Sequence, residues 1–189
     1  HKRAAFLGRV FQDPMMGTAP TMQIEENLAL AARRGQPRGL KWGITALERA
    51  DYRELLKTLD LGLEDRLTAK VGLLSGGQRQ ALTLLMASLK QPKLLLLDEH
   101  TAALDPKTAD KVLALSDQIV QENNLTTLMI THNMKDAIAH GNRLIMMDAG
   151  RVVVDISGED KKKLTVPDLL ALFSRASGSD EANDKMLLS

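Results

Sequence analysis

The sequence predicts an α/β protein with a mostly parallel sheet and an inserted helical lobe. In the second half of the chain, short apolar runs that suit buried strands alternate with segments whose apolar residues recur at helical spacing. Such alternation is typical of parallel strands joined by helices. Before it, residues 15–79 read as helices and turns, so we expect them to form a mainly helical lobe.

Composition excludes several classes of protein. A chain of 189 residues with 44% hydrophobic and 26% charged residues is ordinary for a soluble globular domain with its own core. Its formal net charge of +1 gives no field to recruit nucleic acid or an anionic membrane, and 3% aromatic residues argue against base stacking. The lack of cysteine excludes disulfides and thiolate metal sites, and no apolar run reaches the roughly 20 residues of a transmembrane helix.

The first expected strand covers residues 4–11, which are mostly apolar. It ends before Pro14, because proline cannot continue the hydrogen-bonded ladder of a sheet. Gln12 is therefore a polar side chain at the end of a strand, where most glutamines merely face water.

Capping signals predict the helices of the lobe. Thr21 is the expected N-cap of a helix over 22–34. Thr45 and Glu48 have the spacing of a capping box, which predicts a helix that runs to residue 59. The rest of the lobe is expected to contain a break at 35–39 and short turns over 61–74.

Two N-caps are visible in the second half. Asp105 followed by Pro106 is a helix start, since proline is favoured in the first turn, and Asn133 can cap a short helix ending at Gly141. Lys161–Lys163 follows two acidic residues, so we expect a solvated loop there. The other expected elements are strands over 93–98 and 125–131, a hairpin of 143–148 and 151–156, and helices over 106–123 and 165–175.

The chain is organised around Leu74–Gln78, in which a hydroxyl residue and two glycines open a helix. Ser75 is a good N-cap, because its hydroxyl can accept from the free amides of the first turn. Gly76 and Gly77 lack the β-carbons that would keep a ligand away from the backbone. Exposed amides at the positive end of a helix dipole favour phosphate binding. A glycine-rich turn before an ordinary helix is the alternative.

Polar residues follow the expected strands at Gln12, at Asp98 and Glu99, and at Thr131 and His132. Ligands of doubly wound sheets bind beyond these carboxyl ends of strands. An Asp there suits magnesium, a second carboxylate can accept the proton of an attacking water, and a His can hydrogen-bond a transferring phosphoryl group. Taken singly, the carboxylates could end a strand in solvent and His132 could be a turn residue. Only their joint order indicates nucleotide hydrolysis.

The order of these motifs resembles that of ATP-binding-cassette (ABC) ATPases, the motor subunits of ABC transporters. The resemblance extends to about residue 175, and five segments carry it: Gln12 in Val-Phe-Gln-Asp-Pro, the signature Leu74–Gln78, the Walker B run Leu94–Glu99, Ala103-Leu104-Asp105, and His132 in Ile-Thr-His-Asn. It implies a P-loop NTPase-like fold. In that fold 1–14 and 80–175 form an incomplete RecA-like core, 15–79 form the helical subdomain with the signature, and 176–189 form a disordered tail.

The resemblance also implies two ligands, ATP and Mg²⁺, and a role for each motif residue. Asp98 would serve the magnesium ion, and Gln12, the Q-loop glutamine, would lie near that ion, the attacking water and the membrane partner. Glu99 would be the catalytic base and His132 the switch histidine. The remaining residues would act across a dimer interface: Ser75, Gly76, Gly77 and Gln78 on ATP held by the opposite subunit, and Asp105 as the D-loop residue.

Three positions depart from the family pattern, and one motif is absent. Ala81 and Met86 replace arginines that usually follow the signature, where we expect altered packing rather than lost binding, and His100 replaces the usual proline after the glutamate. No Gly-x-x-x-x-Gly-Lys-Ser/Thr loop occurs in the 189 residues. We expect this phosphate loop and its strands to be encoded upstream of His1, with the missing strand beside 125–131, so that the chain alone binds ATP poorly.

The resemblance therefore predicts the ATPase subunit of a bacterial-type transporter, similar to an importer group with periplasmic binding proteins. The implied partners are a second ATPase subunit, most simply a second copy, integral membrane permease subunits, and a periplasmic or lipoprotein substrate-binding protein, with no nucleic acid. The implied location is peripheral, on the cytoplasmic face of the inner or plasma membrane. A soluble ABC ATPase of repair or translation and a catalytically dead fragment are the alternatives.

Overall fold

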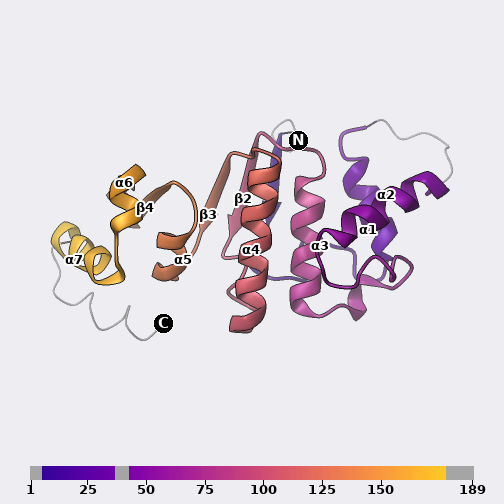
Figure 1. Ribbon diagram of the computed structural model, residues 1–189, viewed down its shortest axis with the longest axis horizontal. Coiled ribbons are helices and arrows are strands. Elements are labelled where there is room, and N and C mark those ends of the chain that lie inside the picture. The colour runs from indigo at the N-terminus through magenta and orange to yellow at the C-terminus, as the bar shows by residue number, and fades with distance from the viewer. Residues whose placement is uncertain (1–5, 37–42, 178–189) are drawn as a thin grey trace. The chain divides into compact units, whose positions relative to one another are not determined.

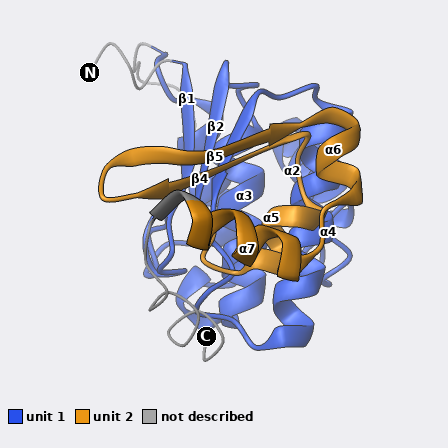
Figure 2. Cartoon of the chain, turned by 90° about the vertical axis from the view of Figure 1, so that its left-hand side faces the viewer, with its two compact units in different colours: residues 1–130 blue, residues 131–189 orange. Residues whose placement is uncertain are grey.

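The computed structural model describes residues 6–36 and 43–177 of the chain (Figure 1). The chain divides into two compact units, His1–Ile130 and Thr131–Ser189, which Figure 2 shows in separate colours. The predicted break at 35–39 and the predicted disordered tail lie largely outside the described residues.

The first unit is built on a sheet of three parallel strands in the order β1-β2-β3. These strands are β1 (Leu7–Val10), β2 (Leu94–Asp98) and β3 (Thr127–Ile130), each shorter than the apolar run that predicted it. Val10 pairs with Leu97, and Asp98 pairs with Ile130, so the carboxyl ends of all three strands lie at one edge. The predicted parallel sheet is confirmed for this unit.

Helices α3 (Gly76–Ser88) and α4 (Pro106–Glu122) pack against each other, and α3 also packs against β1. Gly8 marks the closest approach, because a β-carbon there would lie 2.7 Å from the carbonyl oxygen of Ala87. Leu95 and Leu97 are two residues apart on β2, so both point to the same face of the sheet, and both are buried in the core. The predicted start of α4 at Asp105 is confirmed.

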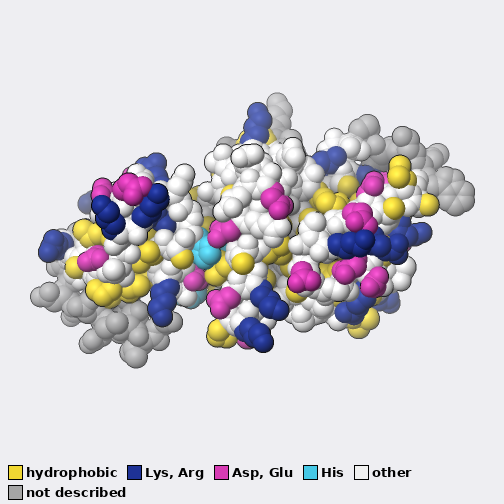
Figure 3. Space-filling view, in the orientation of Figure 1, with side chains coloured by type: hydrophobic (Ala, Val, Ile, Leu, Met, Phe, Trp, Pro, Cys, Tyr) yellow, Lys and Arg dark blue, Asp and Glu magenta, His cyan; other side chains and the backbone are white. Residues whose placement is uncertain are grey.

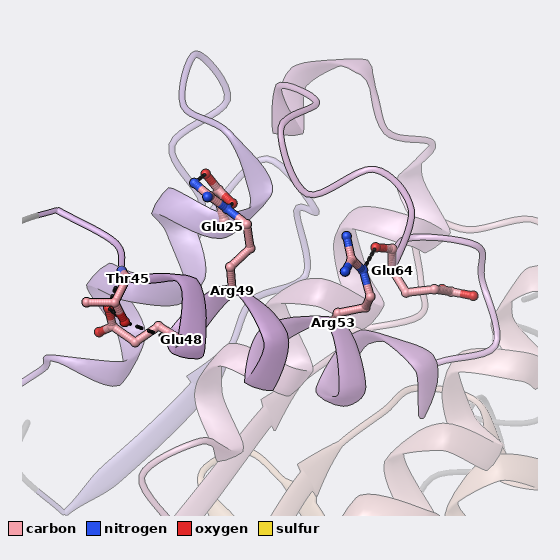
Figure 4. Close-up of polar contacts among 6 residues, drawn as sticks. All are labelled: Glu25, Thr45, Glu48, Arg49, Arg53 and Glu64. Carbon is pink, nitrogen blue, oxygen red and sulfur yellow. Dashed lines mark hydrogen bonds and ion pairs between the residues drawn. The ribbon is translucent and has the colours of Figure 1, made fainter.

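The helical part of the first unit contains α1 (Ile24–Ala32), α2 (Ala46–Lys57) and a 3-10 turn, η2 (Val71–Leu73). The capping box of Thr45 and Glu48 is present at the start of α2, as predicted (Figure 4). Two hydrogen bonds of 2.6 and 2.7 Å from Arg49 to the buried carboxylate of Glu25 tie α2 to α1. On the face drawn in Figure 3, acidic and basic side chains are interspersed over these helices.

The predicted N-cap of the first helix was wrong. Helix α1 is capped by Gln23 rather than Thr21, because the Gln23 amide donates to the Glu26 carboxylate at 2.7 Å and fixes the start of the helix there. The lobe shares one core with the sheet, because Leu28 of α1 and Leu56 of α2 belong to the same buried cluster as Leu95 of β2. The boundary of the helical subdomain at 15–79 stays a prediction.

The second unit contains α5 (Met134–Ala139), the antiparallel hairpin of β4 (Arg143–Asp148) and β5 (Arg151–Ser157), α6 (Gly158–Lys163) and α7 (Val166–Ser177). The predicted hairpin is confirmed. Its turn residues Ala149 and Gly150 both have positive φ, at 45° and 76°, as a tight two-residue turn requires. The small core of this unit is formed by buried Leu144, Val154 and Leu169.

The predicted solvated loop at Lys161–Lys163 was wrong, because these residues form the end of α6. The Lys161 side chain is only 3% exposed, and its ammonium donates to the carbonyl oxygens of Ile138 and His140 at the end of α5. Burial lowers the pKa of Lys161. Throughout the described part of the chain, the helices are too short or too polar to cross a membrane.

Candidate functional site

Asp98 is the last residue of β2 and Glu99 follows it, while Gln12 comes shortly after the neighbouring parallel strand β1, so all three lie at the shared carboxyl edge of the sheet. Gln12 is exposed, and both carboxylates are partly exposed. The structure therefore brings together these three predicted site residues, as the sheet topology requires.

Glu99 has an unusual backbone conformation. Its φ is +44°, in the left-handed region that non-glycine residues rarely occupy, while its amide donates to the carbonyl of Ile130 at 2.9 Å. Such a conformation costs about 1–3 kcal/mol and persists where the surrounding structure imposes it, often at functional sites. Four other non-glycine residues of the described chain also have positive φ, so it is the place of Glu99 at the carboxyl edge of the sheet that connects its conformation with a functional hypothesis.

Asp98 has a partner that the sequence reasoning missed. The Arg9 guanidinium donates to the Asp98 carboxylate at 2.7 Å and lies over the ring of Phe11, 4.5 Å from its centre. Strand alternation could have indicated this partner. Arg9 pairs with Leu96, which is two residues before Asp98 on β2, so Arg9 and Asp98 lie on the same face of the sheet. The ion pair is partly exposed, and we expect it to contribute little to stability.

The start of α3 is closed by a complete capping box. The Ser75 hydroxyl accepts from the Gln78 amide at 3.3 Å, and the Gln78 side-chain oxygen accepts from the Ser75 amide at 3.2 Å. The Gln78 side-chain nitrogen also donates to the carbonyl of Leu61 at 3.2 Å. The N-cap role predicted for Ser75 is confirmed. The role of Gln78 in the capping box was not predicted, although the spacing Ser-x-x-Gln is the sequence signature of such a box.

The two signature glycines lie beside the segment that leads into α4. A β-carbon on Gly77 would lie 2.1 Å from Cγ2 of Thr108, and one on Gly76 would lie 3.3 Å from Cδ2 of Leu104. Gly77 is buried and Gly76 is exposed. Close packing therefore explains Gly77 without any ligand, whereas exposure leaves Gly76 open to solvent.

Asp105 caps α4 by accepting from the Thr108 amide at 3.1 Å. Hydrogen bonds from the Thr108 side chain and backbone hold the pKa of Asp105 below its usual value. His100 is buried, and its ring is 2.9 Å from the hydroxyl of Ser116 on α4. The residue that departs from the family proline therefore holds the segment before Asp105 against α4.

His132 belongs to the second unit. It is exposed and directly precedes Asn133, whose side-chain oxygen accepts from the amides of Lys135 and Asp136 at 2.9 and 3.3 Å. The predicted cap of α5 is confirmed. The catalytic role of His132, like the site roles of the other motif residues, stays a prediction.

Oxygen donors that suit a magnesium ion are present but few. The Asp98 carboxylate and the Gln12 amide follow adjacent strands, and hard cations prefer such oxygens. Among the residues that the structure describes, no group of three or more His, Cys, Asp or Glu side chains could hold a metal by itself. These residues fit an ion that completes its coordination with water and phosphate oxygens.

The comparisons with known proteins agree with this geometry. The ABC transporter family model matches residues 1–102. A tyrosine transport ATP-binding protein of Clostridioides difficile is 49% identical over 176 residues, which cover 93% of this chain and 70% of that protein. The methionine import ATP-binding protein MetN of Streptococcus pneumoniae is 34% identical over 186 residues, which cover 95% of this chain and 48% of that protein. The chain belongs to the ABC transporter ATPase family.

Solved structures place the fold in the same class. A dimeric ATP-binding cassette in a post-hydrolysis state with ADP and phosphate superposes with a TM-score of 0.63 at 30% identity, covering 80% of this chain and 62% of that one. The CbiO1 subunit from Clostridium perfringens matches in fold, with a TM-score of 0.69 at 20% identity over 98% of this chain and 67% of that one. The predicted P-loop NTPase-like α/β fold is thereby confirmed.

Proposed function

We propose that this chain is the nucleotide-binding motor of a bacterial ABC importer, which uses ATP hydrolysis to open and close a dimer. The observation that carries the proposal is the strained Glu99 beside Asp98 and Gln12 at one sheet edge. The identity of 49% to an ATP-binding protein of tyrosine transport supports it. The chain spans 70% of the length of that relative and 48% of the length of the methionine import relative, so the activity of a whole ATPase subunit is part of the proposal.

The chemistry assigned to the sheet edge is proton transfer and charge stabilisation. Glu99 would orient a water and accept its proton, and Gln12 and His132 would hydrogen-bond the water and the transferring phosphoryl group. Asp98 and Gln12 would hold Mg²⁺, which supplies neutralisation of the phosphate charge when bound. Arg9 donates to one oxygen of the Asp98 carboxylate, Oδ2, so Mg²⁺ would either bind the other oxygen or displace Arg9 from this one.

The signature residues are assigned to the partner subunit's nucleotide. Ser75 and Gly76 are exposed at the start of α3, where free amides and the helix dipole favour a phosphate. Gly77 permits the close approach to α4, and Gln78 completes the cap that orients these amides. Asp105 caps the adjacent helix and is assigned to the same dimer interface.

The partners follow from these assignments. We infer a homodimer, integral permease subunits that contact the segment after Gln12, and a periplasmic or lipoprotein substrate-binding protein. The protein would lie peripherally on the cytoplasmic face of the membrane. Co-purification of the intact subunit with a polytopic membrane protein is the expected result, whereas recovery with ribosomes or DNA would favour a soluble ABC ATPase.

The test of the catalytic assignment is Glu99→Gln in the intact ATPase subunit. We expect hydrolysis to fall at least 100-fold, or about 2.7 kcal/mol in activation free energy, while ATP binding persists and a closed dimer accumulates. Size-exclusion chromatography with ATP and a phosphate-release assay measure both effects. Glu54→Gln removes an exposed charge from α2 as the matched control. Equal turnover in the Glu99 and Glu54 variants would remove Glu99 from its role.

A further inference from the structure

Two consecutive buried polar residues follow the signature on α3. Arg79 is 5% exposed and Gln80 is fully buried, although both residue types are rarely buried without a specific partner. The Arg79 guanidinium donates to the carbonyls of Val71, Gly72 and Leu74, the segment that leads into the signature. The Arg79 and Gln80 side chains bond to different segments of the first unit.

The Gln80 side-chain nitrogen donates to the carbonyl oxygen of Phe11 at 2.9 Å. This carbonyl belongs to the peptide group that joins Phe11 to Gln12. Because a peptide group is planar, a bond to its oxygen also fixes the direction of the Gln12 amide. A residue of the signature helix therefore holds the peptide group of the Q-loop glutamine through the carbonyl of Phe11, which is 69 positions away from Gln80 in sequence.

The chain that follows Gln12 packs against the same region of α3. A β-carbon on Gly17 would lie 3.0 Å from Cγ2 of Thr83, and the Arg79 guanidinium contacts the Met15 sulfur. Residues 79, 80 and 83 are neighbours on the helix, because three to four residues complete one turn. The contact is thus an interface between two motif segments rather than a single hydrogen bond.

This interface is incompletely satisfied. Two buried polar atoms of this interface have no hydrogen-bond partner among residues 6–36 and 43–177. They are the side-chain oxygen of Gln80 and the Nε of Arg79. A buried polar group without a partner lowers the stability of the fold. If the only role of this interface were packing, apolar side chains would stabilise it more. The free oxygen of Gln80 offers a second acceptor to amides of the segment after Gln12 if that segment shifts.

We propose that Gln80 is a positioning residue that couples the signature helix to Gln12. The inference rests on the proposed function, in which Ser75 grips nucleotide and Gln12 serves the hydrolytic site. A shift of α3 on nucleotide engagement moves the Phe11–Gln12 peptide through this bond. Gln80 is fully buried and bonds to the Phe11 carbonyl, so in this proposal it acts through Gln12.

The test uses Gln80→Met, which keeps the side-chain volume, and Gln80→Asn, which keeps the amide but is too short to reach Phe11. In the intact ATPase subunit, each is expected to lower kcat about tenfold with the KM for ATP unchanged. Hydrogen exchange of the amides over 12–17 is expected to accelerate in both. Gln121→Met, at an exposed position on α4, is the control and should change neither quantity.

A double-mutant cycle with Gln12→Ala decides whether Gln80 acts through Gln12. We expect Gln80→Met to have no further effect on kcat in the Gln12→Ala background. Multiplicative losses in the double variant, or unchanged exchange over 12–17, would overturn the coupling. If Gln12→Ala alone leaves hydrolysis unchanged, the role proposed for Gln12 fails, and exchange over 12–17 still tests the contact with Gln80.

Discussion

Two regions of the molecule close their helix ends in different ways. In the first unit, the starts of α3 and α4 are capped by Ser75 and Asp105, each bonded to an amide three residues further along the chain. In the second unit, the end of α5 is closed by Lys161 of α6, whose ammonium reaches carbonyls 23 and 21 residues earlier. The first kind of closure is local and the second is tertiary.

The difference explains which closures the sequence predicts. A local cap depends only on residues close in sequence, and this signal identified Ser75, Asp105, Thr45 and Asn133, although it also placed the cap of α1 wrongly at Thr21. A remote cap depends on how the chain returns. A lysine run beside two acidic residues therefore looked like solvated surface, and its buried member was not foreseen.

Replacing the remote cap is expected to have the largest effect on stability. Lys161→Met keeps an unbranched side chain of similar length but leaves the carbonyls of Ile138 and His140 without their donor. We expect the free energy of unfolding to fall by about 3 kcal/mol, since hydrogen bonds from charged donors are the stronger class. Denaturant titration followed by hydrogen exchange of α5 measures this loss.

The control for that variant is Lys162→Met. Lys162 is exposed and pairs with Glu159 on the same helix, so its loss should be within 0.5 kcal/mol, as is typical of surface changes. If the two lysine variants were equally stable, the α5 end would not depend on the buried ammonium.

A change at the signature is expected to separate packing from ligand binding. Gly77→Ala would place a β-carbon 2.1 Å from Cγ2 of Thr108, and we expect this overpacking to cost about 2 kcal/mol. Thr108→Ser removes that methyl group and keeps the hydroxyl, so it should restore stability to Gly77→Ala. Thermal unfolding of the two single variants and the double variant measures the rescue.

The same pair also tests the site. If Thr108→Ser restores both stability and hydrolysis, Gly77 serves the packing of α3 on α4. A double variant that is stable but has lost nucleotide-dependent dimerisation would instead show that a β-carbon at Gly77 obstructs the ligand. Gly76, which is exposed, has no comparable packing reason to be glycine beyond a contact with Leu104.

The candidate site was predictable to the extent that its residues follow strand ends and helix starts. Parallel pairing then carried Gln12, Asp98 and Glu99 to one edge. Strand alternation points to Arg9 only once the register of β1 and β2 is known, and His100 and Gln80 could not be predicted because each contacts a residue that packing alone brings near. The strained φ of Glu99 likewise has no signature in sequence.

The smallest expected effect distinguishes the two local caps by their response to acid. Removing the hydroxyl with Ser75→Ala should cost about 1 kcal/mol at every pH, because serine does not titrate in this range.

Asp105 differs, because hydrogen bonds from Thr108 lower the pKa of its carboxyl in the folded state. The stability that the Asp105 charge contributes is therefore complete above the usual aspartate pKa of about 3.9, and it is lost as pH falls through the lower folded pKa. We therefore expect the difference in melting temperature between the wild type and Asp105→Ala to shrink below about pH 4, while that of Ser75→Ala stays constant. A pH-independent Asp105→Ala difference would mean that the carboxylate does not stabilise the helix through its charge.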